Sequence, residues 1–312
     1  MLNKFIIHSD NHISINDILF SGQSFLWNIH SDEYEYFASV IDYTPIFIRQ
    51  ISLTDFEVCS TQKEINGIPL PQYIRRYFSL DIDTDNLFPE KFLKSHPELW
   101  KLLRDYLPLR ILRQDPFETM ISFMCAQGIG MHLIRKQVSM LKETYGESIT
   151  VTFKGKEIVL HHFPTPERLA AADPFALSQC TNNNRIRAAN IIAASKGIAK
   201  GTIDLDSLCK RDIPLPELRS TLAQISGIGY KIADCIALFG LGRFDAFPID
   251  THVKQYLGEW FNSTTALRSL SPASYLLMDA EARSFLKSEF AGYAGHMLFH
   301  CWRKEIKKLR SF

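Results

Sequence analysis

The pattern of apolar and polar residues changes character near residue 85. Before that point, short runs alternate apolar and polar residues with the period of two that is typical of half-buried strands. Clusters of Asp, Asn and Ser separate these runs, which predict an antiparallel sheet with strands at 5–8, 34–40, 45–49 and 51–56. Gly22 interrupts this region in the stretch SGQSFLW, where it predicts a bend or bulge in a strand, or a close approach of the backbone to a ligand.

From residue 88 onward, apolar residues recur with the spacing of helices. Apart from a hairpin predicted at 150–160, the fold class is therefore α+β, with a small antiparallel sheet domain at 1–110 followed by a larger all-helical domain at 111–312. The predicted helices cover 88–106 with a break at Pro97, 117–127, 131–145, segments beginning at 166 and 185, two short helices around 227–229, and 253–261, 280–287 and 293–309.

Composition narrows the class of protein. A chain of 312 residues with 46% hydrophobic and 22% charged residues is ordinary for a folded protein of about two domains. Apolar runs are too short to span a membrane, and polar residues follow the N-terminus too soon for a signal peptide, so we expect a location in the cytoplasm or nucleoid, or in a nucleus, and no secretion. The six cysteines are scattered without a CxxC pair, so we expect neither zinc nor an iron–sulfur cluster, and no other cofactor.

Charge is distributed unevenly along the chain. Residues 1–110 carry 10 Lys and Arg against 15 Asp and Glu, whereas residues 111–312 carry 25 against 19. The second part is therefore the basic one, although the overall net charge is only +1. An excess of this size is compatible with a polyanionic partner, but it is also compatible with chance.

The stretch 218–252 carries the strongest local signal. It contains two short apolar helical patterns on either side of Gly227 and Gly229. The glycines permit a tight turn, and the helix that follows presents backbone N–H groups at its N-terminus, which attract anions such as phosphate. Lys231 lies on the first turn of that helix. The residues expected on the same face as Lys231 are Asp234, Cys235 and Leu238.

Lys231 and Asp250 are the candidate catalytic residues of this stretch. A neutral lysine amine is a nucleophile, and a carboxylate stabilises positive charge that develops on a sugar ring. With a phosphate-binding turn nearby, the pair suits displacement at the C1′ atom of a nucleotide. Each residue also has a plainer interpretation, since Lys231 could be an exposed helical lysine and Asp250 a helix N-cap.

The same residues resemble a known family. ISGIGYKIADCIALF and AFPIDTHV are similar to the helix-hairpin-helix and the Gly/Pro-Asp loop (HhH-GPD) of base-excision DNA glycosylases. KxADC with PxDxH is most similar to the 8-oxoguanine DNA glycosylase branch, and SGQSFLW, LRQDPFETMISFMC and AGYAGHMLF resemble that branch in the same order. The resemblance covers most of the chain, and it implies the N-terminal sheet domain of that branch at 1–110 and the HhH-GPD domain at 111–312.

The resemblance also implies roles for individual residues. Lys231 would attack C1′, expel the damaged base and hold the sugar as a Schiff base, after which lyase cleavage would follow on the 3′ side. Asp250 would stabilise the positive charge and orient Lys231. Gly22 would offer its carbonyl to the N7 hydrogen that 8-oxoguanine has and guanine lacks. The residues that would bind the base are Gly22, Cys235, Pro248 and Phe299, and those that would bind the DNA backbone or fill the helix are Gly227, Gly229, His252, Gln127 and Arg187.

Two positions depart from the pattern of this branch. The asparagine run that reads the opposite cytosine is replaced by residues 127–130, Gln-Gly-Ile-Gly, in which Gln127 could serve as a wedge. The glutamine that faces the Watson–Crick edge of the base is replaced by Gly295, with His296 next to it. Both the opposite-base preference and the recognition of guanine's edge are therefore open.

These observations favour a bifunctional DNA glycosylase and AP lyase that excises an oxidised purine, such as 8-oxoguanine, in base-excision repair. Its partner would be double-stranded DNA with a damaged base; we expect a monomer that makes no membrane contact. Two alternatives remain at this stage: an enzyme for another damaged base or mainly for abasic sites, and a helix-hairpin-helix module that binds DNA without catalysis. The presence of both Lys231 and Asp250 argues against the second.

Overall fold

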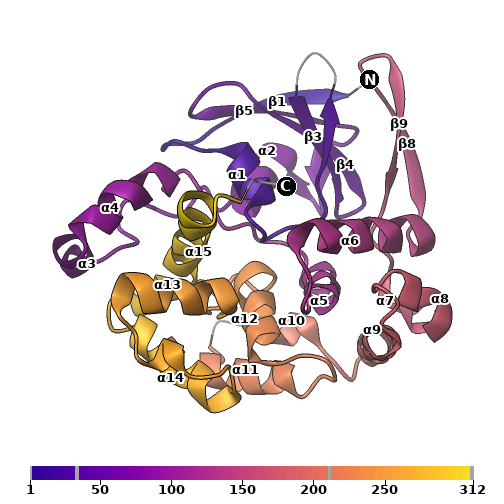
Figure 1. The fold of residues 1–312 in the computed structure, drawn as a ribbon. Coiled ribbons are helices and arrows are strands. Elements are labelled where there is room, and N and C mark those ends of the chain that lie inside the picture. The colour runs from indigo at the N-terminus through magenta and orange to yellow at the C-terminus, as the bar shows by residue number, and fades with distance from the viewer. Residues whose placement is uncertain (1, 32–34, 210–211, 310–312) are drawn as a thin grey trace.

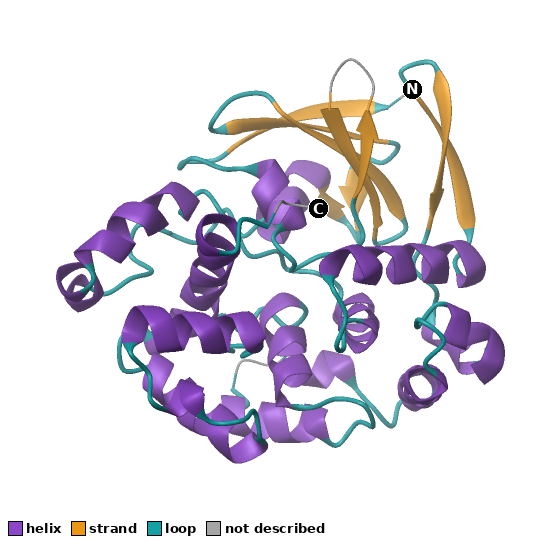
Figure 2. Ribbon diagram, viewed as in Figure 1, coloured by secondary structure: helices purple, strands orange, loops and turns teal. Residues whose placement is uncertain are grey.

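The structure is a computed structural model that describes residues 2–31, 35–209 and 212–309. A twisted sheet forms one side of the molecule and a body of helices forms the other (Figure 2). The predicted α+β class, with an N-terminal antiparallel sheet followed by helices, is confirmed.

The main sheet has five antiparallel strands in the order β1-β5-β4-β3-β2. Three of the predicted strands lie where they were expected, although Tyr34, the first residue of one of them, lies outside the described residues. The strand predicted at 51–56 is misplaced, because residues 51–54 form a tight turn and the strand begins at Asp55. The strands are β1 Asn3–His8, β2 Asn28–Ser31, β3 Glu35–Ile41, β4 Thr44–Gln50 and β5 Asp55–Ser60, and β6 Glu64–Ile65 pairs separately with β7 Ile68–Pro69.

Side chains alternate between the two faces of this sheet, as strand geometry requires. Phe37 packs into the main core on the helical side, while Tyr36 and Ala38 belong to a second cluster on the opposite face. That second face is covered by the hairpin of β8 (Ser148–Phe153) and β9 (Lys156–His161), which stands beside the sheet in Figure 1, and the Phe47 and Phe153 rings stack 4.1 Å apart. Because part of the second half of the chain packs on the sheet, the division at residue 110 stays a prediction.

Most predicted helices occur close to their expected positions. The break at Pro97 and the helix start at 166 are confirmed, the latter with Thr165 as its N-cap. Asn182 and Asn183 adopt left-handed φ angles before the helix that begins at 185. The helix predicted at 280–287 is misplaced, since it begins at Pro272 and ends at Ala282. The α-helices are α1 Ile15–Phe20, α2 Leu70–Tyr77, α3 Glu90–Ser95, α4 Pro97–Leu103, α5 Pro116–Cys125, α6 Met131–Tyr145, α7 Pro166–Ala170, α8 Pro174–Gln179, α9 Arg185–Ala199, α10 Leu205–Leu208, α11 Leu215–Ala223, α12 Tyr230–Phe239, α13 Thr251–Phe261, α14 Pro272–Ala282 and α15 Ala291–Cys301, the last continued by a π-helical turn at Trp302–Ile306.

The segment around Gly22 differs from the predicted strand. The preceding residues form helix α1, and residues 21–27 are irregular, so Gly22 bends a loop rather than a strand. Its φ angle of 97° lies in the left-handed region that only glycine adopts readily. The sequence signal was therefore correct about a special backbone position and wrong about the element that contains it.

Helix α1 is attached to helix α15 by a charged contact. Asp17 accepts a hydrogen bond from the Ser14 hydroxyl at 2.8 Å and lies 3.2 Å from Nε2 of the buried His300. Burial on its own would raise the pKa of Asp17, but the hydrogen bond and charge of His300 and the bond from Ser14 outweigh it and lower the pKa from 3.8 to about 2. Ionised Asp17 therefore stabilises the position of α15 against α1.

Asp17→Asn should make the free energy of unfolding less dependent on pH in the acidic range. Because the pKa is lower in the folded than in the unfolded state, ionised Asp17 contributes its full stabilisation above about pH 4, and this contribution is lost as the pH falls from about 4 to about 2. We expect the variant to lose about 1–2 kcal/mol at pH 7 and nothing near pH 2, in urea unfolding measured at a series of pH values. Asp85→Asn, at an exposed position, is the control. A loss for Asp17→Asn that is the same at both pH values would contradict this account.

Candidate active site

A cavity of about 810 Å³ lies between the helices and the Gly22 loop. Its walls come from segments far apart in sequence: the loop after α1, the end of α5, the start of α6, helix α12, residues 247–253 and helix α15. Of the candidate residues, those that line it are Gly22, Gln127, Gly229, Lys231, Cys235, Pro248, Asp250, His252 and Phe299. Gly227 and Arg187 are the two candidates that do not.

Lys231 reaches the cavity from the first turn of α12. The preceding hairpin turns at Gly227, where φ is 86° and a Cβ atom would lie 2.7 Å from the side-chain nitrogen of Asn190. Helix α12 then begins at Tyr230, and its N-cap residue Gly229 provides no side-chain cap. The Lys231 Nζ atom lies 5.4 Å from the centre of the Phe123 ring, and the charge of Lys231 partly opposes the rise in pKa that burial causes at the Cys235 thiol. The lysine is thus held at the edge of an apolar wall with its amine toward the cavity.

Asp250 is the N-cap of helix α13. Its Oδ1 atom accepts hydrogen bonds from the backbone N–H groups of His252 at 2.8 Å and Val253 at 2.9 Å, so the capping interpretation is confirmed. Among the described residues, Oδ2 accepts no hydrogen bond. The cap fixes the orientation of the carboxylate, and the same carboxylate lines the cavity together with Lys231. A structural and a catalytic role are therefore compatible for this residue.

Gly22 lies close to the thioether of Met131. A Cβ atom on Gly22 would lie 2.2 Å from the terminal methyl of Met131 and 3.8 Å from the Phe299 ring, so a side chain at position 22 would collide with the cavity wall. Met131 is the first residue of α6 and follows Gly128 and Gly130. The Met131 thioether therefore fills the space that a side chain at position 22 would need.

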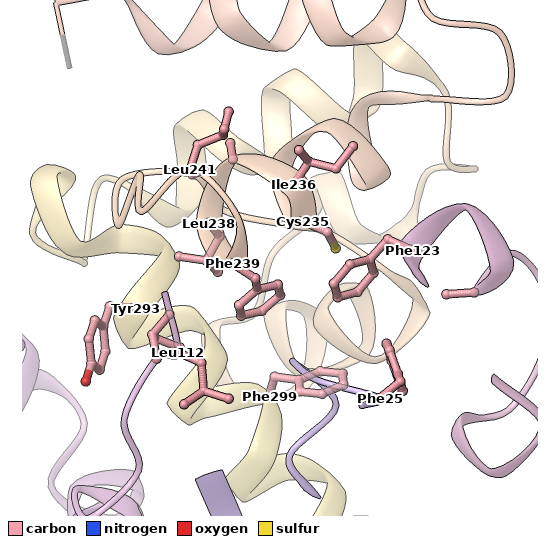
Figure 3. Packing of buried hydrophobic residues seen from close by; sticks show 14 of the residues in the cluster. Phe25, Leu112, Phe123, Cys235, Ile236, Leu238, Phe239, Leu241, Tyr293 and Phe299 are labelled. Atoms are coloured by element: carbon pink, nitrogen blue, oxygen red, sulfur yellow. The ribbon is translucent and has the colours of Figure 1, made fainter. Parts of the chain in front are cut away.

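Aromatic rings form most of the remaining wall. Figure 3 shows the Phe239 and Phe123 rings side by side, with Cys235 above them and Phe299 and Phe25 below, and all five residues line the cavity. Burial raises the pKa of the Cys235 thiol to about 12, so the sulfur is protonated and apolar in character. Cys235 and Phe299 therefore come from different walls of one cavity, as a sandwich for a planar base requires.

Two histidines also reach the cavity. His252 packs edge-on against the Phe299 ring at 5.9 Å, and its pKa is lowered chiefly by burial, against the opposing charge of Asp250. His296, on α15, lies 2.9 Å from the Ser21 hydroxyl, and burial lowers its pKa to about 3. Both rings are therefore neutral at neutral pH.

Asp234 does not share the cavity with Lys231, contrary to the face predicted for α12. It is fully buried on the other side of the helix, where it binds Nε of Arg219 at 2.9 Å and the Tyr275 hydroxyl at 2.6 Å. Arg219 also contacts Asp279 of α14. Asp234 follows Lys231 by three residues and Cys235 follows it by four, so the two lie on opposite sides of Lys231 around the helix. Cys235 lines the cavity, whereas Asp234 joins α12 to α11 and α14.

Gln127 connects the cavity to the hairpin. Its side-chain amide donates to the Gly227 carbonyl, and its own carbonyl accepts from the guanidinium of Arg187 at 2.6 Å. Arg187 is largely buried, and Gly227 turns away from the cavity. The contacts of these three residues with DNA stay predictions.

Gln23 is a positioning residue that the sequence reasoning missed. Its buried side-chain amide donates to the carbonyls of Ile18 at 2.9 Å and Arg110 at 2.8 Å, and its oxygen accepts from the N–H of Leu112 at 2.8 Å. Gln114 then donates to the Gln23 carbonyl. The glutamines in SGQSF and LRQDP were the available signal, because buried amides need several partners.

The described part of the chain contains no group of three or more His, Cys, Asp or Glu residues that could hold a metal ion. The cysteines are unpaired, and Cys209 is the exposed one. No helix within those same residues is long and apolar enough to cross a membrane.

Known proteins resemble the chain in both sequence and fold. Residues 5–120 match the family model of the 8-oxoguanine DNA glycosylase N-terminal domain. The N-glycosylase/DNA lyase of Saccharomyces cerevisiae is 29% identical over 260 residues, which cover 78% of this chain and 67% of the yeast protein. The N-glycosylase/DNA lyase OGG1 of Arabidopsis thaliana is 29% identical over 246 residues, which cover 77% of this chain and 63% of the plant protein. The chain thus spans about two thirds of the length of these relatives.

A solved structure matches the fold along almost the whole chain. The 8-oxoguanine glycosylase/lyase of Clostridium acetobutylicum, in complex with double-stranded DNA containing cytosine opposite 8-oxoguanine, has a TM-score of 0.78. The match covers 99% of each chain at 23% sequence identity. At this level of identity the likeness concerns the arrangement of the sheet and the helices.

Gln23→Met should destabilise the protein, because three buried backbone groups lose their partner while the volume of the side chain is nearly kept. We expect a loss of about 2 kcal/mol or more in the free energy of unfolding, measured by urea titration. Gln62→Met, at an exposed position, is the matched control and should change stability by less than about 0.5 kcal/mol. A loss below about 1 kcal/mol for Gln23→Met would show that the amide does not hold the Gly22 loop.

Proposed function

We propose that this chain, which is similar to the 8-oxoguanine branch of the helix-hairpin-helix DNA glycosylases, excises 8-oxoguanine from double-stranded DNA and then cleaves the strand as an AP lyase. Lys231 is the nucleophile in this proposal, and Asp250 stabilises the charge on the sugar. The observation that carries it is the single cavity that holds both residues opposite Gly22.

The proposed reaction proceeds in two steps. The Lys231 amine attacks C1′ as the bond from C1′ to the base breaks, the base leaves with the bonding electrons, and loss of a proton and ring opening give a Schiff base between Nζ and C1′. Removal of a C2′ proton then expels the 3′ phosphate. The Asp250 carboxylate, oriented by its two backbone bonds, lies in the same cavity and favours the positive charge at C1′.

The cavity walls suit a flipped purine. Cys235 and Phe299 lie on different walls, and the aromatic residues that line the cavity can stack on a base removed from the double helix. The Gly22 carbonyl is the proposed acceptor for the N7 hydrogen, and no side chain at position 22 stands between it and the base. Pro248 and His252 complete the wall beside Asp250.

The hairpin is the proposed contact with the DNA backbone. The N-cap residue of α12, the exposed Gly229, has no side chain to cap the helix, so the first N–H groups of α12 are available to a phosphate. We propose a monomer that works on chromosomal DNA, in a nucleoid or nucleus. We further propose that the reaction uses no metal or other cofactor, since the amine and the carboxylate supply the chemistry.

Lys231→Gln should abolish the covalent intermediate. The variant keeps the length of the side chain but has no amine, so borohydride should trap no protein–DNA adduct on an abasic or 8-oxoguanine duplex, whereas binding to the abasic duplex should stay within about tenfold of the unmodified protein. Lys101→Gln, on α4 outside the cavity lining, should trap normally. Persistent trapping by Lys231→Gln would assign the nucleophile to another amine, and the absence of trapping by the unmodified protein would contradict catalysis altogether.

The loop between α5 and α6 favours weak selection of the opposite base. Gly128 and Gly130 have no side chains, and the Gln127 amide is already bonded to the Gly227 carbonyl. A loop of this composition offers few groups that could hydrogen-bond the orphaned base.

Duplexes with 8-oxoguanine opposite each of the four bases test this selectivity. We expect single-turnover excision rates within about tenfold of one another, because few side-chain contacts distinguish the opposite bases. Undamaged guanine serves as the control and should not be excised. A preference of more than about 100-fold for cytosine would contradict the account of the loop, and no excision in any duplex would contradict 8-oxoguanine as the substrate.

A further inference from the structure

We propose that His296 reads the C6 edge of the flipped purine by donating a hydrogen bond from Nδ1 to the O6 carbonyl. This inference rests on the proposed function and identifies which part of the lesion, besides N7, the cavity selects. It makes His296 a specificity-determining residue, and it predicts a preference for guanine-type over adenine-type oxidised bases.

His296 is a buried polar side chain in a mostly apolar wall. It is 7% exposed, and it lines the cavity. Its ring stacks on Phe299 at 5.6 Å with an angle of 22°, and packs against Phe239 at 5.1 Å. These rings hold the imidazole in one orientation, as a residue that selects a substrate by a single hydrogen bond requires.

Among the residues that the structure describes, one of the two ring nitrogens of His296 has a hydrogen-bond partner and the other has none. Nε2 lies 2.9 Å from the Ser21 hydroxyl, and within residues 2–31, 35–209 and 212–309 no group bonds Nδ1. A polar nitrogen in a buried wall is costly unless something pairs with it, so Nδ1 is available to a molecule in the cavity. Burial also keeps the ring neutral, so one nitrogen carries the proton and the other does not.

The partners of Ser21 indicate which nitrogen carries the proton. The Ser21 hydroxyl lies 3.4 Å from the Ile18 carbonyl, and that carbonyl already accepts from the Gln23 amide at 2.9 Å. Nε2 of His296 is the closer acceptor for the hydroxyl. We therefore assign the proton to Nδ1, which makes this nitrogen a hydrogen-bond donor toward the cavity.

The position of His296 beside Gly22 selects the atom that it meets. Ser21, its partner, is the residue directly before Gly22, whose carbonyl is the proposed acceptor for N7–H. On a purine, O6 lies next to N7 on the same edge, so a donor next to the N7 acceptor is suited to O6. Adenine-type bases carry an amino group there, which is itself a donor and would be repelled.

The neighbouring glycine does not offer a competing group. A Cβ atom at Gly295 would lie 2.2 Å from the Phe247 ring, so the space that a longer side chain would need is already filled. The Gly295 carbonyl accepts from the Tyr256 hydroxyl at 3.3 Å. On this turn of α15, His296 is thus the side chain that brings a hydrogen-bonding group to the cavity.

Four duplexes separate the contributions of the lesion's atoms. 8-Oxoguanine and 8-oxohypoxanthine both carry O6, but 8-oxohypoxanthine lacks the 2-amino group. 8-Oxoadenine keeps N7–H and O8 and has an amino group at C6 in place of O6. The fourth duplex contains an abasic site. With the unmodified protein we expect kcat/KM for the first two to agree within about threefold, and 8-oxoadenine to be at least about tenfold slower. This series needs no variant, so it decides the proposal even if the variants below fail to fold.

His296→Phe keeps a flat ring between Phe239 and Phe299 but has no donor. We expect kcat/KM to fall about tenfold for 8-oxoguanine and 8-oxohypoxanthine, and to stay within about threefold for 8-oxoadenine and for trapping on the abasic duplex. Tyr293→Phe is the matched control, because Tyr293 is buried on the same helix, keeps its ring in the variant and does not line the cavity. It should leave the ratio of 8-oxoguanine to 8-oxoadenine unchanged.

The outcomes distinguish this inference from the proposed function. If His296→Phe lowers activity equally on all four duplexes, His296 only supports the fold. If it lowers kcat/KM equally on the three lesions and leaves trapping on the abasic duplex unchanged, its donor meets O8. Either result overturns the assignment to O6. Equal rates on 8-oxoguanine and 8-oxoadenine by the unmodified protein overturn it as well. Trapping on the abasic duplex without excision of any lesion would instead overturn the proposed substrate, and this inference with it.

Discussion

The buried amide of Gln23 is the contact on which the geometry of the cavity depends. Through it the loop that carries Gly22 is bonded to α1 and to the extended segment around residue 112. That segment is bonded in turn to the C-terminal end of α12, where the Gln114 N–H donates to the Phe239 carbonyl at 2.9 Å. A short chain of buried hydrogen bonds thus joins the wall that would recognise the base to the helix that carries Lys231. Buried hydrogen bonds in a low-dielectric core are costly to break, so the Gly22 loop is held rigidly relative to helix α12.

Burial has a second consequence for the cavity, because it removes charge from its walls. The pKa of the Cys235 thiol is raised and those of His252 and His296 are lowered, chiefly by burial in each case. All three groups are therefore neutral near pH 7. The Asp250 carboxylate then acts without competing cationic histidines beside it, and its effect on positive charge at a sugar is strengthened by the apolar surroundings. The aromatic wall thus supplies both the shape for a base and the environment in which one carboxylate is effective.

Much of this arrangement could be predicted from local sequence. Lys231 and Asp250 lie beside turns and caps whose chemistry is specified within a few residues, such as Gly227 and the Asp-Thr-His start of α13. The helix start at Pro166, marked by a proline after the capping Thr165, was also predicted correctly, whereas the start at Pro272 was missed. What could not be predicted depends on contacts between distant segments. The three-residue spacing places Asp234 next to the face of Lys231, and whether that position lines the cavity or is buried against Arg219 and Tyr275 depends on how α11 and α14 pack on α12. The role of Gln23 is of the same kind, since its partners are up to 89 residues away.

This difference has a counterpart in function. The residues proposed for bond cleavage come from 227–252, a continuous segment whose geometry is set by a hairpin, a helix start and a cap. The residues proposed for base selection come from the Gly22 loop, the α5–α6 loop and α15, and they meet only in the folded chain. A substitution in α15 can therefore alter which base is accepted without altering the attack on C1′. The His296 side chain is hydrogen-bonded to Ser21, so a substitution on α15 also acts on the Gly22 loop. These two elements, which are proposed to recognise the base, are therefore coupled to each other more directly than either is to Lys231.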